Sequence, residues 1–373
     1  MRVLAAAEAA ARAEIDNRTD GVSPQIPGLV YCAVDRTGNT IFSHASGKKS
    51  LDGDSSMTMD TIFWLASCTK LITSIACMQL VERAGFGYAF EDLKLRDWSR
   101  PVGLDDFSGN VSDVLHRPLV NQPGTKFQYG VGLDWAGVIV ERASGLSLED
   151  YFQLFILQPL GIKDIGFFPT TEMKLSLASM HQRAKDGTLS VRDHLYRYPL
   201  LPPNPGGEED RFCMGGAGCF GKPIEFCRVL AALLNDGTSP HTGAKIVTPE
   251  TVKEMFTDQI PTMPRYCNEY TPSGKPELAN PCPLIPSAEE DLTEGWGLSF
   301  SLSHTECPTG RAAGSGSWEG LANLFWFADR TNGIGGIIAS QILPYGDLEV
   351  INCSESVEKI IYNGLAKREG GSP

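Results

Sequence analysis

A serine and a lysine three positions apart stand at the start of an apolar helical stretch, and this pair is the strongest candidate for chemistry in the chain. Ser67 and Lys70 share one face of a helix, because positions i and i+3 are neighbours on its surface. The sequence places Ser67 in the first turn, where backbone N–H groups lack intrahelical partners and carry the positive end of the helix dipole. Serine becomes nucleophilic when a neighbour removes its proton, and lysine does so when burial lowers its pKa. The spacing therefore indicates a serine nucleophile with a lysine base.

A Ser-x-x-Lys pair also has a simple structural explanation. In a chain of 373 residues such pairs occur by chance, with the serine capping a solvated helix and the lysine exposed. The neighbouring residues favour chemistry, because the aromatic stretch 63–65 precedes Ser67 and apolar residues at helical spacing lead to an expected helix end at Gly85. Cys68 is a rival nucleophile, but no motif supplies it with a histidine base.

The composition is that of a soluble globular protein with an acidic balance. Hydrophobic residues make up 42% and charged residues 21%, and the formal net charge is −13. A nucleic-acid partner would need a basic face, and no apolar run approaches the roughly 18–20 residues that span a bilayer. The alanine-rich start contains Glu8 and Arg12, so it predicts a helix and not a secretory signal. We therefore expect a cytoplasmic protein with neither nucleic acid nor a membrane as partner.

Metal and cofactor motifs are missing from the sequence. None of the ten cysteines forms a Cys-x-x-Cys pair, and the six histidines show no metal spacing. Without a secretory signal we expect the cysteines to be reduced. No Gly-x-Ser-x-Gly elbow is present, which argues against a conventional α/β-hydrolase. The stretch 215–218 lacks Gly-Lys-Ser/Thr, so it indicates close backbone packing and not a phosphate site.

Strands at both ends of the chain, with helices between them, must position the serine–lysine pair. Apolar stretches bounded by turn residues predict strands at 28–35, 40–45, 295–303, 316–328 and 334–343. Helical patterns and caps predict helices at 4–16, 133–144, 148–157, about 223–235, from Pro249, and 349–366. The segments expected to be irregular are 85–113, 170–212 and 258–294. These elements predict an α/β lobe made of residues 1–84 and 225–373, with a helical and irregular insert at 85–224.

Three separated motifs occur in one order along the chain: 67–70 (Ser-Cys-Thr-Lys), 123–137 (Pro-Gly-Thr-Lys-Phe-Gln-Tyr-Gly-Val-Gly-Leu-Asp-Trp-Ala-Gly) and 318–326 (Trp-Glu-Gly-Leu-Ala-Asn-Leu-Phe-Trp). Together they resemble the serine β-lactamase/penicillin-binding-protein superfamily. Within it they most resemble the class C-like esterase and transesterase branch, in particular the fungal lovastatin-type acyltransferases. The resemblance covers nearly the whole chain. It implies an antiparallel sheet flanked by helices and built from both termini, plus an inserted, mostly helical lobe.

The resemblance assigns a role to each matching residue. Ser67 is similar to the acylated nucleophile, Lys70 to the general base, and Tyr129 to the tyrosine that shares proton transfer with the lysine. The oxyanion hole would consist of the backbone N–H groups of Ser67 and Leu321. Trp318 takes the place that lysine holds in true β-lactamases.

The same comparison implies where substrate binds and what it is not. Trp64, Phe220 and Trp318 would line an apolar cleft, with Glu319 and Gly320 beside them. In place of Lys-Thr-Gly the chain has Trp-Glu-Gly, and Tyr129 lacks the Tyr-x-Asn pattern, so groups that hold an antibiotic's carboxylate are absent and antibiotic hydrolysis is not expected. On a strand, Glu319 should point away from the face that carries Trp318. The stretch 241–243 (His-Thr-Gly) mimics the third motif but falls in a polar turn.

One family stretch, Leu-x-His-x-Ser-Gly between the first and second motifs, is not found in this sequence. Two interpretations stay open for the segment between Lys70 and Tyr129. Either the helical lobe is shortened and the cleft is open, or the sequence has lost part of an exon.

Three functions remain as hypotheses. The first is a cofactor-independent acyltransferase of secondary metabolism, which forms an acyl-Ser67 intermediate from an ester, thioester or carrier-bound donor and passes the acyl group to a small-molecule alcohol. The second is a carboxylesterase or lactonase of the same fold. The third is a catalytically silent homologue with a binding role.

Overall fold

A seven-stranded antiparallel sheet forms the centre of the computed structural model, which describes residues 1–21, 23–78, 88–122, 125, 127–201, 212–263, 273–281 and 293–365. The strand order is β2-β1-β12-β11-β10-β9-β8. The bounds are β1 Gly28–Asp35, β2 Thr40–Gly47, β8 Glu294–Trp296, β9 Ser301–Ser303, β10 Gly316–Gly320, β11 Leu324–Asp329 and β12 Ile334–Ala339. The amino-terminal hairpin joins the carboxy-terminal strands through the β1–β12 pair. This confirms the predicted fold class.

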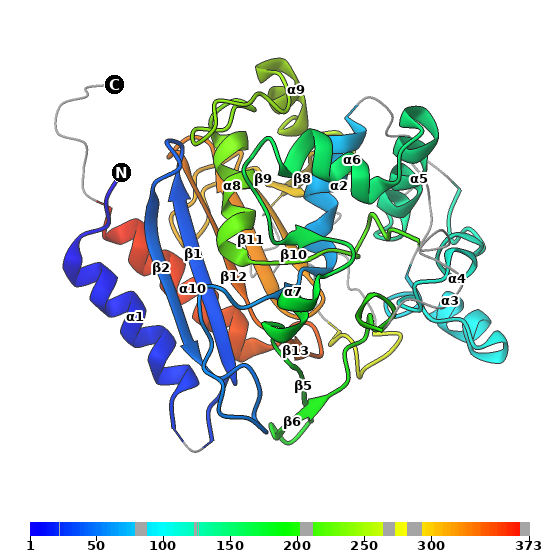
Figure 1. Cartoon of the computed structure of the whole chain (residues 1–373), viewed down its shortest axis with the longest axis horizontal. Coiled ribbons are helices and arrows are strands. Elements are labelled where there is room, and N and C mark those ends of the chain that lie inside the picture. Colours follow the sequence, from blue (N-terminus) through cyan, green and yellow to red (C-terminus); the bar gives the residue numbers. More distant parts are fainter. Residues whose placement is uncertain are drawn as a thin grey trace.

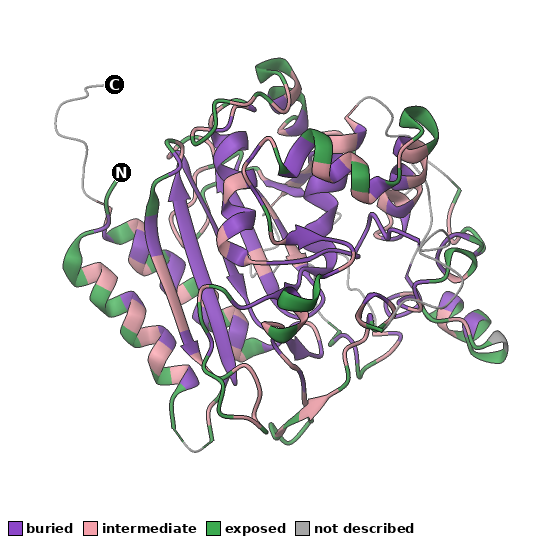
Figure 2. Ribbon diagram, viewed as in Figure 1, coloured by how far each residue is buried: buried purple, intermediate pink, exposed green. Residues whose placement is uncertain are grey.

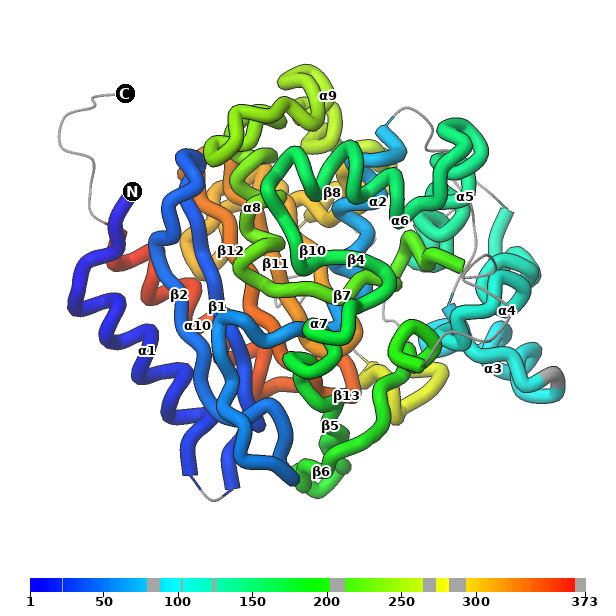
Figure 3. The backbone as a smooth tube through the Cα atoms, in the orientation of Figure 1, coloured from blue at the N-terminus to red at the C-terminus, as the bar shows by residue number. Residues whose placement is uncertain are grey.

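Helices cover both faces of this sheet (Figure 1). Helices α1 (Ala5–Thr19) and α10 (Leu348–Asn363) lie side by side on one face, so the two ends of the described chain meet there (Figure 3). Helix α8 (Pro223–Leu234) packs on the other face, and the strands between these layers are almost wholly buried (Figure 2). None of the described helices is long and apolar enough to cross a membrane.

A second group of helices packs beyond α8 and carries the candidate site. Helix α2 (Thr69–Cys77) contacts α5 (Gly132–Ser144) and α6 (Leu148–Phe152), which continues as the π-helical turn η3 (Gln153–Leu157). Helix α5 ends where predicted, at Gly145, whose φ of +72° suits glycine. Thr248 caps α9 (Pro249–Met255) as predicted, because its side chain accepts a hydrogen bond from the Thr251 N–H.

Two segments predicted to be irregular contain short elements, so these predictions are wrong. The first holds α3 (Leu93–Ser99), the 3₁₀ turn η2 (Arg100–Val102) and α4 (Val111–Leu115). The second holds α7 (Thr171–Leu175), β5 (Met180–Arg183), β6 (Leu189–Arg192) and the 3₁₀ turn η4 (Tyr198–Leu200), and the short strand β4 (Ile165–Gly166) precedes it. One or two turns of helix give too few residues for a periodic pattern. The predicted helix end at Gly85 lies outside the described residues.

Two strands predicted as continuous fold as hairpins instead. The segment 295–303 splits into β8 and β9, and 316–328 splits into β10 and β11. The turns contain Ser299 and Asn323, which have φ values of +80° and +59°. An apolar pattern does not reveal such a reversal, because both arms of a buried hairpin are apolar.

Two small sheets complete the described fold. Strand β7 (Phe220–Gly221) lies between β3 (Phe63–Trp64) and β4, and β5 lies between β6 and β13 (Ile342–Leu343). The first of these sheets holds the segment that leads into Ser67, because Leu65 donates a backbone hydrogen bond to Cys219 (2.8 Å).

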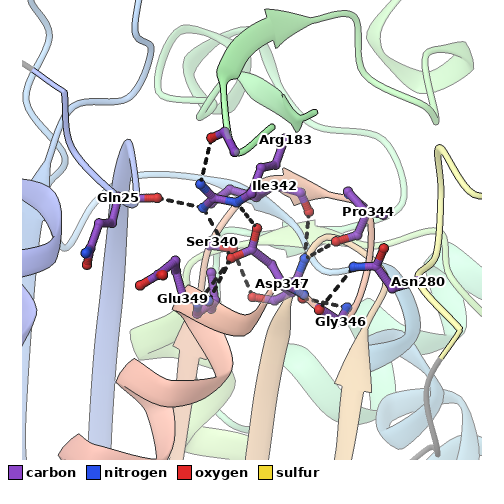
Figure 4. A network of polar contacts seen from close by, with 12 residues as sticks. Gln25, Arg183, Asn280, Ser340, Ile342, Pro344, Gly346, Asp347 and Glu349 are labelled. Carbon is purple, nitrogen blue, oxygen red and sulfur yellow. Dashed lines mark hydrogen bonds and ion pairs between the residues drawn. The ribbon is translucent and has the colours of Figure 1, made fainter. Parts of the chain in front are cut away.

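Asn323 clamps the turn between β10 and β11. Its buried side chain donates to the carbonyls of Ile342 and Pro344 (2.9 Å each) and accepts from the N–H groups of Gly346 and Asp347 (3.0 and 2.9 Å). Figure 4 shows these partners around Asp347. The clamp fixes the end of β10, next to Leu321, whose N–H is predicted for the oxyanion hole.

Replacing Asn323 by alanine is expected to cost about 3–5 kcal/mol of unfolding free energy, because four buried backbone groups lose their partner and alanine disfavours a positive φ. Urea unfolding followed by circular dichroism measures this loss. Asn39→Ala, at an exposed turn, is the matched control and should change stability by less than about 0.5 kcal/mol. Equal stability of the two variants would contradict the clamp.

Candidate active site

Ser67 and Lys70 lie together at the start of α2, as the spacing predicts. Ser67 is in the 3₁₀ turn η1 (Ala66–Cys68), one turn earlier than the α-helix proper, and Lys70 Nζ donates to Ser67 Oγ (3.1 Å). Ala66 has a φ of +45°, a left-handed conformation that is unfavourable for alanine. Such local strain is characteristic of functional sites, and here it sharpens the bend that presents Ser67.

Tyr129 reaches the same hydroxyl from the segment that leads into α5. Its phenol donates to Ser67 Oγ (2.7 Å), and Trp318 Nε1 donates to the Tyr129 oxygen (3.3 Å). Lys70 Nζ lies 4.8 Å from the centre of the Tyr129 ring. The structure therefore brings together four residues that the three sequence motifs contributed.

Lys70 is almost fully enclosed, with 2% of its surface exposed. Besides Ser67, its ammonium group donates to the Gly216 carbonyl (2.6 Å) and the Tyr88 hydroxyl (3.2 Å), so all three of its donors have partners. Burial lowers the pKa of Lys70 to about 8, although the carboxyl groups of Asp134 and Glu91 act in the opposite direction. At this pKa about a tenth of the molecules hold a neutral amine at pH 7.

Three of the residues around Lys70 were not predicted from the sequence: Tyr88, Asp134 and Gly216. Asp134 Oδ1 accepts from the Gly216 N–H (3.0 Å), and the Gly216 carbonyl accepts from Lys70. Asp134 Oδ2 is buried and has no hydrogen-bond partner among the described residues. Burial raises the pKa of Asp134. A charged residue inside the apolar helix α5 was the available signal, since a buried carboxylate requires a reason.

The glycines of the stretch 215–218 pack closely, as predicted. A Cβ atom on Gly215 would lie 2.5 Å from the Leu133 carbonyl, and one on Gly216 would lie 2.4 Å from Asp134 Oδ2. Only glycine allows this backbone to approach α5 and Lys70 so closely.

Strand β10 ends beside the segment that carries Ser67. A Cβ atom on Gly320 would lie 2.9 Å from the Leu65 carbonyl, and β10 contacts η1. Leu321 follows directly, so the two backbone N–H groups predicted for the oxyanion hole, those of Ser67 and Leu321, belong to neighbouring segments. Their joint action on a substrate oxygen stays a prediction.

Aromatic rings form a series beside the nucleophile. The ring centres of Tyr129 and Trp318 are 5.1 Å apart, those of Trp318 and Trp296 are 4.6 Å apart, and those of Trp296 and Phe127 are 4.9 Å apart. Tyr88 extends the series on the other side, with its ring centre 5.4 Å from that of Tyr129. Tyr129, Trp296 and Phe127 are half-buried and offer apolar, aromatic surface near Ser67, whereas Trp318 and Tyr88 are buried.

Trp64 and Phe220 occupy a different position. They face each other in the small β3–β7 sheet and are fully buried, and Trp64 Nε1 donates to the Ala217 carbonyl (2.8 Å). These two side chains expose no surface to a ligand in this structure, so their predicted contact with substrate stays a prediction.

The competing motifs lie outside this arrangement. Cys68 is fully buried, and burial raises the pKa of its thiol, which disfavours the thiolate that would attack a substrate. The stretch 241–243 lies in the turn between α8 and α9, where Thr242 Oγ1 donates to the Pro159 carbonyl (2.6 Å). Within the described part of the chain, no cluster of three or more histidine, cysteine or acidic side chains is placed to hold a metal ion.

With this geometry established, comparison with known proteins identifies the family. A family model described as Beta-lactamase matches residues 7–89 and 88–267. The chain belongs to the beta-lactamase family. The two matched pieces meet at Tyr88 and Ala89, the point at which the described structure resumes after α2.

Relatives within the beta-lactamase family include fungal acyltransferases and an esterase. The chain is 28% identical to a lovastatin esterase of Penicillium rubens, over 87% of this chain and 91% of that protein. It is also 28% identical to a monacolin J acid methylbutanoyltransferase of Aspergillus terreus, over 91% and 92%. The structure of a simvastatin synthase from Aspergillus terreus matches with a TM-score of 0.77, 26% identity and 98% of each chain covered. These findings confirm the resemblance that the three motifs predict.

Proposed function

We propose that the chain is a cofactor-independent serine acyl-transfer enzyme that forms an acyl-Ser67 intermediate. The observation that carries this proposal is the position of Ser67 Oγ between Lys70 Nζ (3.1 Å) and the Tyr129 hydroxyl (2.7 Å). In the neutral fraction of Lys70, Nζ takes the Ser67 proton as Oγ attacks the carbonyl carbon of an ester or thioester. The resulting oxyanion would bind the N–H groups of Ser67 and Leu321.

Tyr129 is the donor to the leaving group in this proposal. Burial raises the pKa of Tyr129, so its phenol keeps its proton at neutral pH. It donates this proton to the departing alcohol or thiol, and the proton held by Lys70 restores it. In the second half of the reaction an acceptor alcohol gives its proton to the same pair as its oxygen attacks the carbonyl carbon of acyl-Ser67. The pair returns that proton to Ser67 Oγ as the bond between Oγ and the acyl group breaks and the new ester leaves.

We favour an alcohol over water as the acceptor. The aromatic series beside Ser67, from Phe127 to Tyr129, offers apolar surface to a bulky acceptor and acyl chain. Relatives named as transferases and as an esterase show that both outcomes occur in this family. Hydrolysis by the same acyl-enzyme is therefore the second candidate.

Intact-protein mass spectrometry tests the proposal. After brief incubation with p-nitrophenyl butyrate, and separately with a butyryl thioester, the protein should gain the mass of one butyryl group. Faster loss of this adduct when butanol is added, with formation of butyl butyrate, identifies a transferase, whereas loss at an unchanged rate identifies a hydrolase. A folded protein that gains no mass and releases no nitrophenol would contradict the proposal and favour a catalytically silent binding protein.

Asp134 provides a test of how Lys70 is held. Asp134→Ala removes the acceptor of the Gly216 N–H and should lower kcat/KM for the butyrate ester by about 10- to 100-fold, because the loop that fixes Lys70 loses a charge-assisted hydrogen bond. Asp134→Asn retains an acceptor oxygen at this position and should keep most of the activity. Equal activity of Asp134→Ala and the parent protein would show that the loop does not depend on this contact.

A further inference from the structure

Among the described strands, β10 has a partner along only part of its edge toward β9, and the unpaired part lies next to the segment of Ser67. Strand β10 pairs with β9 only through Gly316 and Ser317, and no described strand pairs with residues 318–320 on that side. The unpaired edge leads directly to Leu321. An unpaired strand edge offers backbone hydrogen bonds to an extended ligand. A substrate whose carbonyl group lies at Ser67 can therefore extend along β10.

Two side chains flank this edge from opposite faces of the strand. Trp318 lies on the face of Tyr129, to which its indole donates a hydrogen bond. Glu319 lies on the other face, as expected for the next residue of a strand, and accepts a hydrogen bond from the Tyr345 hydroxyl. A ligand along the edge therefore has an aromatic ring on one side and a carboxyl group on the other.

Glu319 acts on the reaction centre through its charge. Its negative charge raises the pKa values of Tyr129 and Cys68, the two groups on either side of Ser67. No cation among the described residues forms a salt bridge with Glu319, and its partner Tyr345 is a neutral phenol. A partly buried carboxylate that lacks a cationic partner repels a nearby anion and attracts a cation.

We propose that Glu319 is a specificity-determining residue that, in its ionised form, makes the site accept neutral and cationic acyl groups and reject anionic ones. This inference rests on the proposed function, because it concerns the substrate of the acyl-Ser67 chemistry. The charged end of an acyl chain that follows β10 would lie within several ångströms of the Glu319 carboxylate. At such separations, and at the effective dielectric constant of a protein surface, a change in the sign of the substrate charge is expected to alter kcat/KM by about tenfold or more.

Three esters that differ in charge test the inference directly. They are the p-nitrophenyl esters of butyrate, of 4-(trimethylammonio)butyrate and of succinate, which are neutral, cationic and anionic. For the parent protein at about pH 9, kcat/KM for the cationic ester should exceed that for the anionic ester by about tenfold or more. In Glu319→Gln the two values, each divided by the value for the neutral ester, should lie within about threefold of each other. Glu306→Gln, which removes an exposed carboxylate between β9 and β10, is the matched control and should keep the parent ratio.

The pH dependence provides a second readout. Burial raises the pKa of Glu319 to about 8; Glu294 and Glu91 act in the same direction, Arg311 acts in the opposite direction, and the Tyr345 hydroxyl faces the carboxyl group. Discrimination against the anionic ester should therefore be weak at about pH 6 and strong at about pH 9. Loss of the positive charge on Lys70 over the same range acts in the same direction. Comparison with Glu319→Gln, which keeps Lys70, separates the two contributions.

Two results would overturn the inference. One is a cationic-to-anionic ratio in Glu319→Gln equal to that of the parent protein, and the other is a parent preference for the anionic ester. If the parent protein hydrolyses none of the esters, the proposed function fails. The charge preference of the site is then tested separately, by measuring ligand affinity. Tryptophan fluorescence gives the Kd of the three corresponding p-nitroanilides, and equal Kd ratios in the parent and in Glu319→Gln would overturn the inference.

Discussion

Ser67→Ala is expected to eliminate the acyl adduct and to lower kcat/KM for p-nitrophenyl butyrate by at least about 1,000-fold. The reason is that Ser67 Oγ is the atom on which the hydrogen bonds from Lys70 and Tyr129 converge, and alanine offers no nucleophile there. Stopped-flow release of nitrophenol gives the rate, and intact-protein mass gives the adduct. A thermal melt should match that of the parent protein, because the substitution removes one small hydroxyl group.

Cys68→Ala is the matched control for this experiment. The thiol is adjacent in sequence but fully buried, and burial raises its pKa, so its removal should leave the adduct and the rate within about threefold of the parent values. An adduct that persists in Ser67→Ala and disappears in Cys68→Ala would reverse the assignment of the nucleophile.

Lys70→Met should cause a loss of activity of similar size, since an unassisted serine keeps its proton. Methionine fills most of the volume of the lysine stem, and it removes a charge whose burial already lowers the pKa to about 8. The folded state should therefore keep its stability, or gain some, because a buried ammonium group costs free energy. Loss of rate without loss of stability would separate a chemical role of Lys70 from a structural one.

The pH profile of the parent protein tests the same role. With a pKa of about 8, the neutral amine is scarce at pH 6 and predominates above pH 8, so kcat/KM should rise about tenfold for each pH unit below the pKa and then level off. Ser67→Ala combined with Lys70→Met should be no slower than either single variant, because the two residues act as one unit. A profile that is flat between about pH 6 and pH 9 would contradict Lys70 as the base.

The sequence by itself determined the elements whose pattern is local and long. The strands β1, β2 and β12 follow from apolar stretches between turn residues, and the long helices α1, α5, α8 and α10 follow from helical spacing and end signals. The spacing of Ser67 and Lys70 placed them on one face, and the order of the three motifs identified Tyr129 and Trp318 as their neighbours. The division into a lobe of residues 1–84 and 225–373 and an insert of 85–224 stays a prediction.

The tertiary structure decided which distant segments meet. Tyr88 and Gly216 accept hydrogen bonds from Lys70 across 18 and 146 positions of sequence, and the carboxyl group of Asp134 acts on the pKa of Lys70 across 64 positions. No local pattern encodes such interactions. The reversal at Asn323 depends on hydrogen bonds with residues about 20 positions away. Elements such as α3 and β6 have local partners but are too short for a periodic pattern. The sequence predicts the nucleophile and its base because their spacing follows from helix geometry. The environment that lowers the pKa of Lys70, and the edge of β10 at Glu319 that no described strand pairs with, exist only after the chain has folded.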